Sequence, residues 1–225
     1  MYVPSFNAVT DPAELAAMLG SARVAQLVTF GRDGLEATIV PILYDPGAAA
    51  DTLAGGALGR VRLHLARANQ QWLRLDNNVE ALLIISGPDA YVSPGYYPSK
   101  AADPRVVPTW NYETLQARGR VVVHDDARWT EQVVRDLTDR HESARPEPWS
   151  VEDAPGEYIA KMLGAIVGVE VQLSSVQAKR KLSQNRQPGD VDGVVAALAA
   201  SDRPGDQAVA TAMRNLAGRA DVTSR

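Results

Sequence analysis

Short apolar segments with the length of β-strands follow one another through the first half of the chain and return near residue 165. They cover residues 24–30, 35–44, 59–65, 79–85, 90–93, 114–124 and 165–173. Most neighbours are joined by short turns, such as the Gly-Arg-Asp-Gly sequence at 31–34, so antiparallel pairing is expected. An antiparallel sheet of this kind usually closes or folds on itself because its edges would otherwise be exposed. The pattern therefore predicts a small β-barrel.

Helical periodicity is found in the segments around these strands. It predicts helices at residues 11–20, 69–76, 127–140, 157–163, 189–200 and 206–217. Asn69 is expected to cap the second of them. A turn is predicted at Gly87-Pro88, irregular structure at 141–155 and a long loop at 45–58. The fold class is therefore α+β and mainly β, with peripheral helices.

The composition excludes several kinds of chemistry. The 225 residues contain no cysteine, which removes disulfides, thiolate catalysis and thiolate-bound zinc. The net charge of −4 indicates no basic surface of the kind that nucleic acid requires. No apolar run approaches ~18 residues, and the first residues lack the pattern of a signal peptide. We therefore expect a cytoplasmic protein that spans no membrane.

The common catalytic and nucleotide-binding motifs are missing from the sequence. There is no glycine-rich dinucleotide or P-loop motif, no GxSxG and no HExxH. The spacing of the three histidines does not support a multi-histidine metal site either. No sequence motif therefore supports Rossmann-type binding, nucleotide hydrolysis, serine hydrolysis or zinc proteolysis.

The strand expected at 59–65 carries the first candidate residue. Val61, Leu63 and Leu65 alternate with polar residues, so His64 lies on the face opposite the buried one. Such a histidine either faces water or another element, or it holds a ligand. One histidine is enough to hold a heme iron. The other two histidines, His124 and His141, are expected on the solvated surface.

Two further groups of residues could contribute to a cofactor site. An aromatic and polar cluster contains Tyr91, Ser93, Tyr96, Tyr97 and Trp110. It could stack on a planar cofactor, or it could fill the mouth of the barrel. The run at 179–186 is the densest basic segment. It is either solvated or, because serine and amide side chains are interleaved with the charges, suited to a phosphate or carboxylate.

Four segments of the chain resemble the PaiB-type family, often named FMN-binding negative transcriptional regulators. They are MYVP with Phe6, HLARAN at 64–69, YVSP at 91–94 through Tyr97 with VPTWNY at 107–112, and KLSQNR at 181–186. They follow the family's order, with Gln70 where the family commonly has proline. The resemblance implies a split β-barrel like that of flavin reductases. Residues 1–188 would form the cofactor-binding domain, and residues 189–225 a C-terminal helical extension packed on the barrel or dimer.

The resemblance also implies a homodimer with the cofactor site at the subunit interface. FMN is the expected cofactor, and heme b with His64 as axial ligand is the alternative. The ring system would lie near the aromatic cluster, and its acidic groups would meet Arg67 and the 181–186 run. Lys181 is in addition the candidate acid–base group. The implied cofactor-binding residues are His64, Arg67, Asn69, Tyr91, Ser93, Trp110, Lys181, Ser183, Gln184 and Arg186.

The family label implies an FMN-binding regulator of transcription. Two enzymatic alternatives stay open, and the sequence does not decide whether the protein is an enzyme. One is a heme-dependent enzyme that forms an N–N bond in an N-hydroxylated amino acid, as piperazate synthase does. The other is an FMN-dependent redox enzyme. Direct DNA contact is not expected, because the C-terminal helical pair carries acidic residues, the wrong sign for phosphate contact, at Asp190, Asp192, Asp202 and Asp206.

Overall fold

The computed structural model describes residues 1–47 and 58–223, with side chains up to residue 218. The predicted loop at 45–58 therefore falls mainly outside the described residues. Contacts group the chain into two units, which we name the terminal unit and the central unit. The terminal unit comprises Met1–Thr10, Ser86–Leu115 and Gln177–Arg225, and the central unit comprises Asp11–Ile85 and Gln116–Val176.

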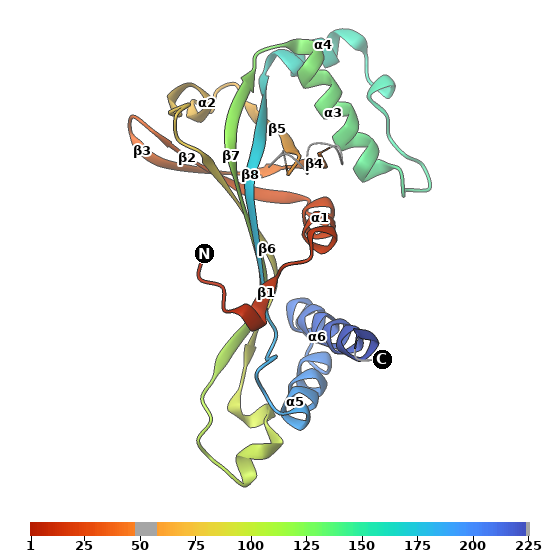
Figure 1. Ribbon diagram of the computed structural model, residues 1–225. Coiled ribbons are helices and arrows are strands. Elements are labelled where there is room, and N and C mark those ends of the chain that lie inside the picture. The colour runs from red at the N-terminus through yellow and green to blue at the C-terminus, as the bar shows by residue number, and fades with distance from the viewer. Residues whose placement is uncertain (48–57, 224–225) are drawn as a thin grey trace. The chain divides into compact units, whose positions relative to one another are not determined.

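Each predicted helix and strand has a counterpart in the structure (Figure 1). The strands are β1 (Ala8–Val9), β2 (Val24–Gly31), β3 (Gly34–Pro41), β4 (Leu43–Asp45), β5 (Arg60–Ala66), β6 (Ala81–Val92), β7 (Thr109–His124) and β8 (Ile166–Lys181). The α-helices are α1 (Pro12–Ser21), α2 (Gln71–Arg74), α3 (Ala127–Glu142), α4 (Gly156–Gly164), α5 (Pro188–Ala199) and α6 (Pro204–Thr223). Short 3-10 turns are η1 (Ser5–Asn7), η3 (Pro94–Tyr96), η4 (Pro98–Ala101) and η5 (Val151–Asp153). No helix within the described ranges is long and apolar enough to cross a membrane.

The strands form one mainly antiparallel sheet with the order β3-β2-β6-β7-β8-β5-β4, and β1 pairs with β8 beside this path. β2 runs antiparallel to β3 and β6, and β5 runs antiparallel to β4 and β8. In the described part of the chain no pairing joins the two edge strands β3 and β4, so the sheet stays open. The predicted α+β class with helices at the periphery is confirmed.

The core of the central unit lies on one face of the paired strands β5 and β8. Val61, Leu63 and Leu65 are buried and face Val171, Val169 and Val167 of β8 in register. The predicted alternation of β5 is therefore confirmed, and His64 lies on its other face. Helix α3 lies beside these strands in Figure 1, and its Val133 and Leu137 pack against Leu43.

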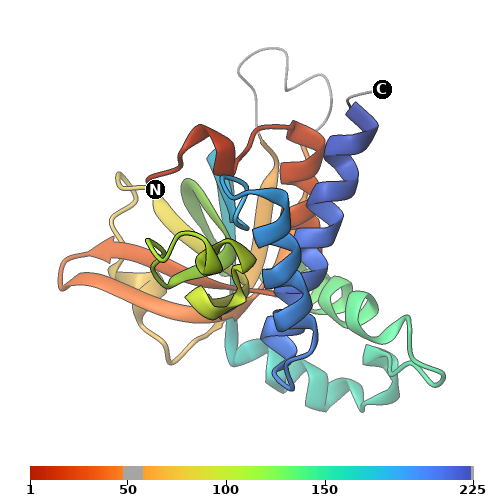
Figure 2. The same cartoon turned by 90° about the horizontal axis from the view of Figure 1, so that it is seen from below.

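The core of the terminal unit is built by the two C-terminal helices, which lie side by side in Figure 2. The predicted apolar stripes are confirmed, since Val194 and Leu198 of α5 and Val209 and Met213 of α6 are buried in one cluster. The same cluster contains Ala90, Val92, Tyr97 and Leu182. It thereby fixes the end of β8 and the turns that follow β6, where the candidate site residues lie.

The predicted turn at Gly87-Pro88 is wrong, because both residues lie inside the continuous strand β6. A Cβ atom at Gly87 would lie 2.8 Å from the Cβ of Glu113 on β7. The glycine therefore allows a close approach of two strands, which is the other common use of glycine in a sheet. Similarly, β8 does not end at 173 but continues to Lys181, so the first part of the basic run is strand.

The expectation for His124 is also wrong in part. Its ring stacks on Trp129 with the ring centroids 3.9 Å apart and an interplanar angle of 9°. Its Nε2 atom is buried and has no hydrogen-bond partner. His124 is thus a partly buried packing residue, whereas His141 is exposed as predicted.

Candidate functional site

A pocket of about 280 Å³ in the terminal unit brings together three of the four segments that carry the family resemblance. Its walls come from residues 2–7, 107–111 and 179–186, and we name it the cationic pocket because Lys179, Lys181 and Arg186 line it. The pairing of β1 with β8, with Ala8 opposite Lys179, holds the N-terminal segment along the pocket. Lys179 and Lys181 reach the same side because side chains alternate along a strand.

The three cations of this pocket interact with neutral groups. Lys179 is buried, donates from Nζ to the carbonyl of Tyr2 at 3.3 Å and lies 5.3 Å from the ring centroid of Tyr112. Lys181 donates from Nζ to Thr109 Oγ1 and to the carbonyl of Trp110. The guanidinium of Arg186 lies 4.8 Å above the ring of Tyr97.

No carboxylate in the described part of the chain forms an ion pair with Lys179, Lys181 or Arg186. Acidic side chains do pair with the other basic residues nearby, for example Glu113 with Arg180. Partly buried positive charge without a counter-ion is costly, and an anion bound in the pocket removes that cost. The arrangement is therefore suited to an acidic ligand.

The pKa of Lys181 is lowered from its ordinary value. Burial is the largest cause, and it lowers the pKa of Lys181 because it disfavours the charged form. The nearby charges of Lys179 and Arg186 lower the pKa further, and Tyr112 opposes them. A bound anion would favour the protonated amine and raise this pKa again.

Two predicted site residues of the 181–186 run shape the end of the pocket. Ser183 has a positive φ of 66°, and its hydroxyl exchanges hydrogen bonds with the buried amide of Asn111. Gln184 accepts from the backbone N–H of Leu182 at 2.7 Å and donates to the carbonyl of Arg180 at 2.6 Å. These contacts hold the chain reversal after β8, and Gln184 has no place in the pocket wall.

The predicted aromatic group lies beside the cationic pocket and not in its wall. Tyr91 and Trp110 contact each other edge to face with the centroids 6.0 Å apart, and both are about half exposed. Ser93 caps η3 by accepting from the N–H of Gly95 at 3.1 Å. Trp110 takes part in the pocket through its backbone carbonyl, which accepts from Lys181.

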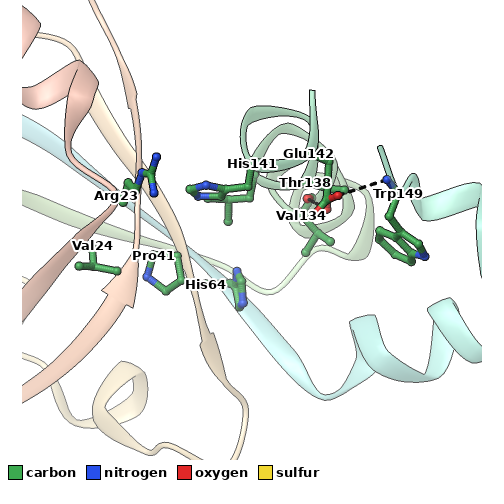
Figure 3. Close-up of a pocket in the computed structure, with 10 residues that line it drawn as sticks. Arg23, Val24, Pro41, His64, Val134, Thr138, His141, Glu142 and Trp149 are labelled. Atoms are coloured by element: carbon green, nitrogen blue, oxygen red, sulfur yellow. Dashed lines mark hydrogen bonds between the residues drawn. The ribbon is translucent and has the colours of Figure 1, made fainter. Parts of the chain in front are cut away.

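A second pocket, of about 540 Å³, lies in the central unit and contains His64 (Figure 3). We name it the histidine pocket. It lies between β2, β3 and β5 on one side and α3 on the other, and its lining is mostly apolar. Figure 3 shows His64 from β5 and His141 from α3 around it, together with Arg23 and Glu142.

His64 has the properties of a neutral ligand. Its Nδ1 atom is buried and has no hydrogen-bond partner in the part of the chain that the structure describes. Burial lowers the pKa of His64, so the uncharged imidazole dominates at neutral pH. A neutral imidazole is the form that binds a metal ion.

The two other predicted residues of this segment are engaged in local contacts. Arg67 pairs with Asp125 at 2.6 Å and donates to the carbonyls of Gly164 and Ile166. Asn69 donates to Thr38 at 3.0 Å and accepts from the N–H of Gln71, but the N-cap of the short helix α2 is Gln70, so the predicted cap is wrong by one residue. Neither residue lines the histidine pocket.

Sequence reasoning named Lys181, Ser183 and Arg186 as site residues and included Lys179 only in the basic run at 179–186. It missed Asn7, which lines the same pocket. The signal for Lys179 was available, because it stands two residues before Lys181 and a strand places both on one face. Asn7 has no comparable signal, since it is brought to the pocket only by the pairing of the next residue, Ala8, with Lys179.

Comparison with solved structures defines the fold class. The FAD and heme binding protein from Mycobacterium smegmatis is similar with a TM-score of 0.51 and 16% sequence identity, over 85% of this chain and 80% of that one. At this identity the likeness concerns the fold alone. It confirms the split-barrel architecture that the family resemblance implies.

The chain belongs to the family described as "Putative FMN-binding domain", whose model matches residues 1–175. It is 25% identical over 215 residues to protease synthase and sporulation protein PAI 2 of Bacillus subtilis, covering 96% of this chain and 97% of that protein. It is also 37% identical over 148 residues to an uncharacterized protein of Aspergillus fumigatus. That match covers 59% of this chain, and the chain spans 56% of the length of that relative. The predicted resemblance to the PaiB-type family is confirmed.

Proposed function

We propose that the protein binds FMN in the manner of a PaiB-type cytoplasmic flavoprotein, with the phosphate in the cationic pocket. The observation that carries the proposal is the group of three cations, Lys179, Lys181 and Arg186, that has no carboxylate partner in the described residues. The exposed apolar side chains of Tyr2, Phe6 and Val107 belong to the same pocket. They offer a planar ring a surface next to the phosphate.

A titration with FMN tests this proposal directly. Addition of the purified protein is expected to change the flavin fluorescence until one FMN per chain is bound. Binding should weaken as salt is added, because salt screens the attraction between the phosphate and the cations. A protein that leaves the FMN fluorescence unchanged at every concentration contradicts the proposal.

The family label includes transcription regulation, and we propose that any such role proceeds without direct DNA contact. Asp192 of α5 and Asp202 of the connection between α5 and α6 are exposed on the surface of the terminal unit. These charges repel phosphate groups. In a mobility-shift assay with promoter DNA we expect no retarded band at moderate salt. A salt-sensitive, sequence-selective band would show the opposite.

We also propose a homodimer formed through the outer face of β2 and β3 in the central unit. Four large apolar side chains on this face are exposed, namely Val24, Phe30, Leu35 and Ile39. The register places Phe30 opposite Leu35 and Val24 opposite Pro41. The outward positions 24, 26, 28, 30, 35, 37, 39 and 41 carry no charged residue.

A face of this kind marks an interface, because large exposed apolar patches are rare on monomers. A second copy is a suitable occupant, since the same uncharged face can pair with itself about a two-fold axis. Val24 and Pro41 also line the histidine pocket, so the partner would sit beside that pocket. For the heme alternative with His64 as ligand, this supports the cofactor site at a subunit interface that the family resemblance implies.

Heme b is the second candidate cofactor, and the buried, unpartnered Nδ1 of His64 in a mostly apolar pocket favours it. His64 would supply the axial ligand, and iron would supply redox chemistry there. Formation of an N–N bond in an N-hydroxylated amino acid would require this iron, so heme binding is the first test of that enzymatic alternative.

Replacing His64 by alanine tests the heme candidate. On titration with hemin, the wild-type protein should develop a sharp Soret band, and His64→Ala should abolish it. His141→Ala is the matched control, because His141 lines the same pocket and its loss should leave the band in place. If only His141→Ala lost the band, His141 and not His64 would be the iron ligand, and the proposal would be wrong.

A further inference from the structure

Asn7 is the buried polar residue of the cationic pocket that lacks a partner. The residue is 4% exposed, and no donor among the described residues forms a hydrogen bond with its Oδ1 atom. Asn7 ends the short turn η1, in which its backbone N–H donates to the carbonyl of Pro4 at 2.9 Å. The next residue, Ala8, pairs with Lys179. The fold therefore fixes Asn7 in the pocket wall beside the cations.

A buried acceptor without a donor is unfavourable, and native structures contain few of them. The neighbouring amide in the same wall is satisfied, because Asn111 exchanges hydrogen bonds with Ser183. Lys179 donates to the carbonyl of Tyr2 and not to Asn7. The free acceptor in the wall therefore points to a ligand that brings its own hydrogen-bond donor.

We propose that Oδ1 of Asn7 accepts a hydrogen bond from a ligand hydroxyl next to the phosphate, so that the pocket selects phosphate esters of polyols. This inference rests on the proposed binding of FMN and names the part of the ligand that Asn7 recognises, which is a hydroxyl next to the phosphate. Pockets that enclose a whole ligand measure about 300 to 1,000 Å³. At about 280 Å³ the cationic pocket accommodates one end of FMN, which is the phosphate and the neighbouring ribityl hydroxyls.

Three flavins separate the groups that Asn7 could recognise. FMN carries the ring, the ribityl chain and the phosphate, riboflavin lacks the phosphate, and lumiflavin lacks the ribityl chain as well. Asn7→Leu is expected to weaken both FMN and riboflavin about tenfold, which is the effect of one lost hydrogen bond to an otherwise buried group. Lumiflavin binding should not change.

Asn7→Asp is the conservative variant. Its side chain keeps an acceptor oxygen, so riboflavin affinity should stay within about twofold of wild type. Its negative charge would pair with Lys179 and Lys181 and compete with the phosphate, so FMN affinity should fall about tenfold. The test therefore remains valid if Asn7→Leu misfolds. If the role of Asn7 were only structural, Asn7→Asp would change the affinities for FMN and riboflavin equally.

Three outcomes would overturn the inference. One is an unchanged riboflavin affinity in a folded Asn7→Leu, and another is an equal loss for lumiflavin, which would place the donor on the ring. The third is a loss of riboflavin binding in Asn7→Asp. A wild-type protein that binds none of the flavins refutes the proposed function and this inference with it. A wild-type protein that binds FMN while Asn7→Leu behaves normally refutes the inference alone.

Discussion

Lys181→Met is expected to weaken FMN binding about 30-fold and to leave riboflavin binding unchanged. The described residues that line the pocket around Lys181 include no acidic side chain, so its charge is available to a phosphate. A hydrogen bond between charged groups contributes about 2 kcal/mol, which corresponds to that loss in affinity. Fluorescence titrations of the variant with both flavins measure the effect.

The control for this variant is Lys161→Met. Lys161 is an exposed lysine of α4 in the central unit, and its loss removes the same net charge. If both variants weaken FMN equally, the effect comes from net charge and not from the pocket. An equal loss of riboflavin in Lys181→Met would likewise argue against a phosphate contact.

The pH dependence of FMN binding follows from the same residue. The pKa of Lys181 is lowered in the free protein, and a bound phosphate would raise it. The affinity for FMN is therefore highest at a pH below the lowered pKa of Lys181, and it falls as the pH rises through that pKa. Lys181→Arg should remove this decline, because a guanidinium stays charged throughout this range.

Ile39→Glu is expected to convert the proposed homodimer into a monomer. Ile39 is 71% exposed on the edge strand β3, in the middle of the apolar face. In a two-fold interface the substitution introduces a carboxylate from each chain, and like charges forced together cost about 4 kcal/mol. That cost raises the dissociation constant of the dimer about 1,000-fold. Sedimentation velocity at micromolar protein measures the change.

Leu73→Glu provides the matched control for the dimer experiment. Like Ile39, Leu73 is a largely exposed apolar residue of the central unit, but it lies on α2, outside the apolar face. Its replacement should leave the dimer intact. A wild-type protein that sediments as a monomer, or an Ile39→Glu variant that remains dimeric, would contradict the proposed interface.

The sequence was sufficient where a residue's environment follows from its own strand or helix. The alternation of β5 placed His64 on the correct face, and the apolar stripes of α5 and α6 identified Val194, Leu198 and Met213 as core residues. The prediction of a turn at Gly87-Pro88 was wrong because glycine is common both in turns and where two strands approach closely. The distinction depends on Glu113, which is remote in sequence.

The candidate site was harder to predict because its polar residues form hydrogen bonds and ion pairs with residues that are distant in sequence. Arg67 looked like a phosphate ligand, but Asp125 and two backbone carbonyls hold its guanidinium. Asn69 is similarly held by Thr38. Among the described residues, Lys179 and Lys181 have no such acidic partner, and this difference depends on long-range contacts that the sequence does not show.

The ratio of the FMN and riboflavin affinities of the wild-type protein tests the central claim most directly. The two ligands differ only in the phosphate, so the ratio isolates what the cations of the pocket contribute. Lys179, Lys181 and Arg186 acting together should make FMN bind at least about 100-fold more tightly, a difference of about 3 kcal/mol. Equal affinities for FMN and riboflavin would contradict phosphate recognition by the cationic pocket.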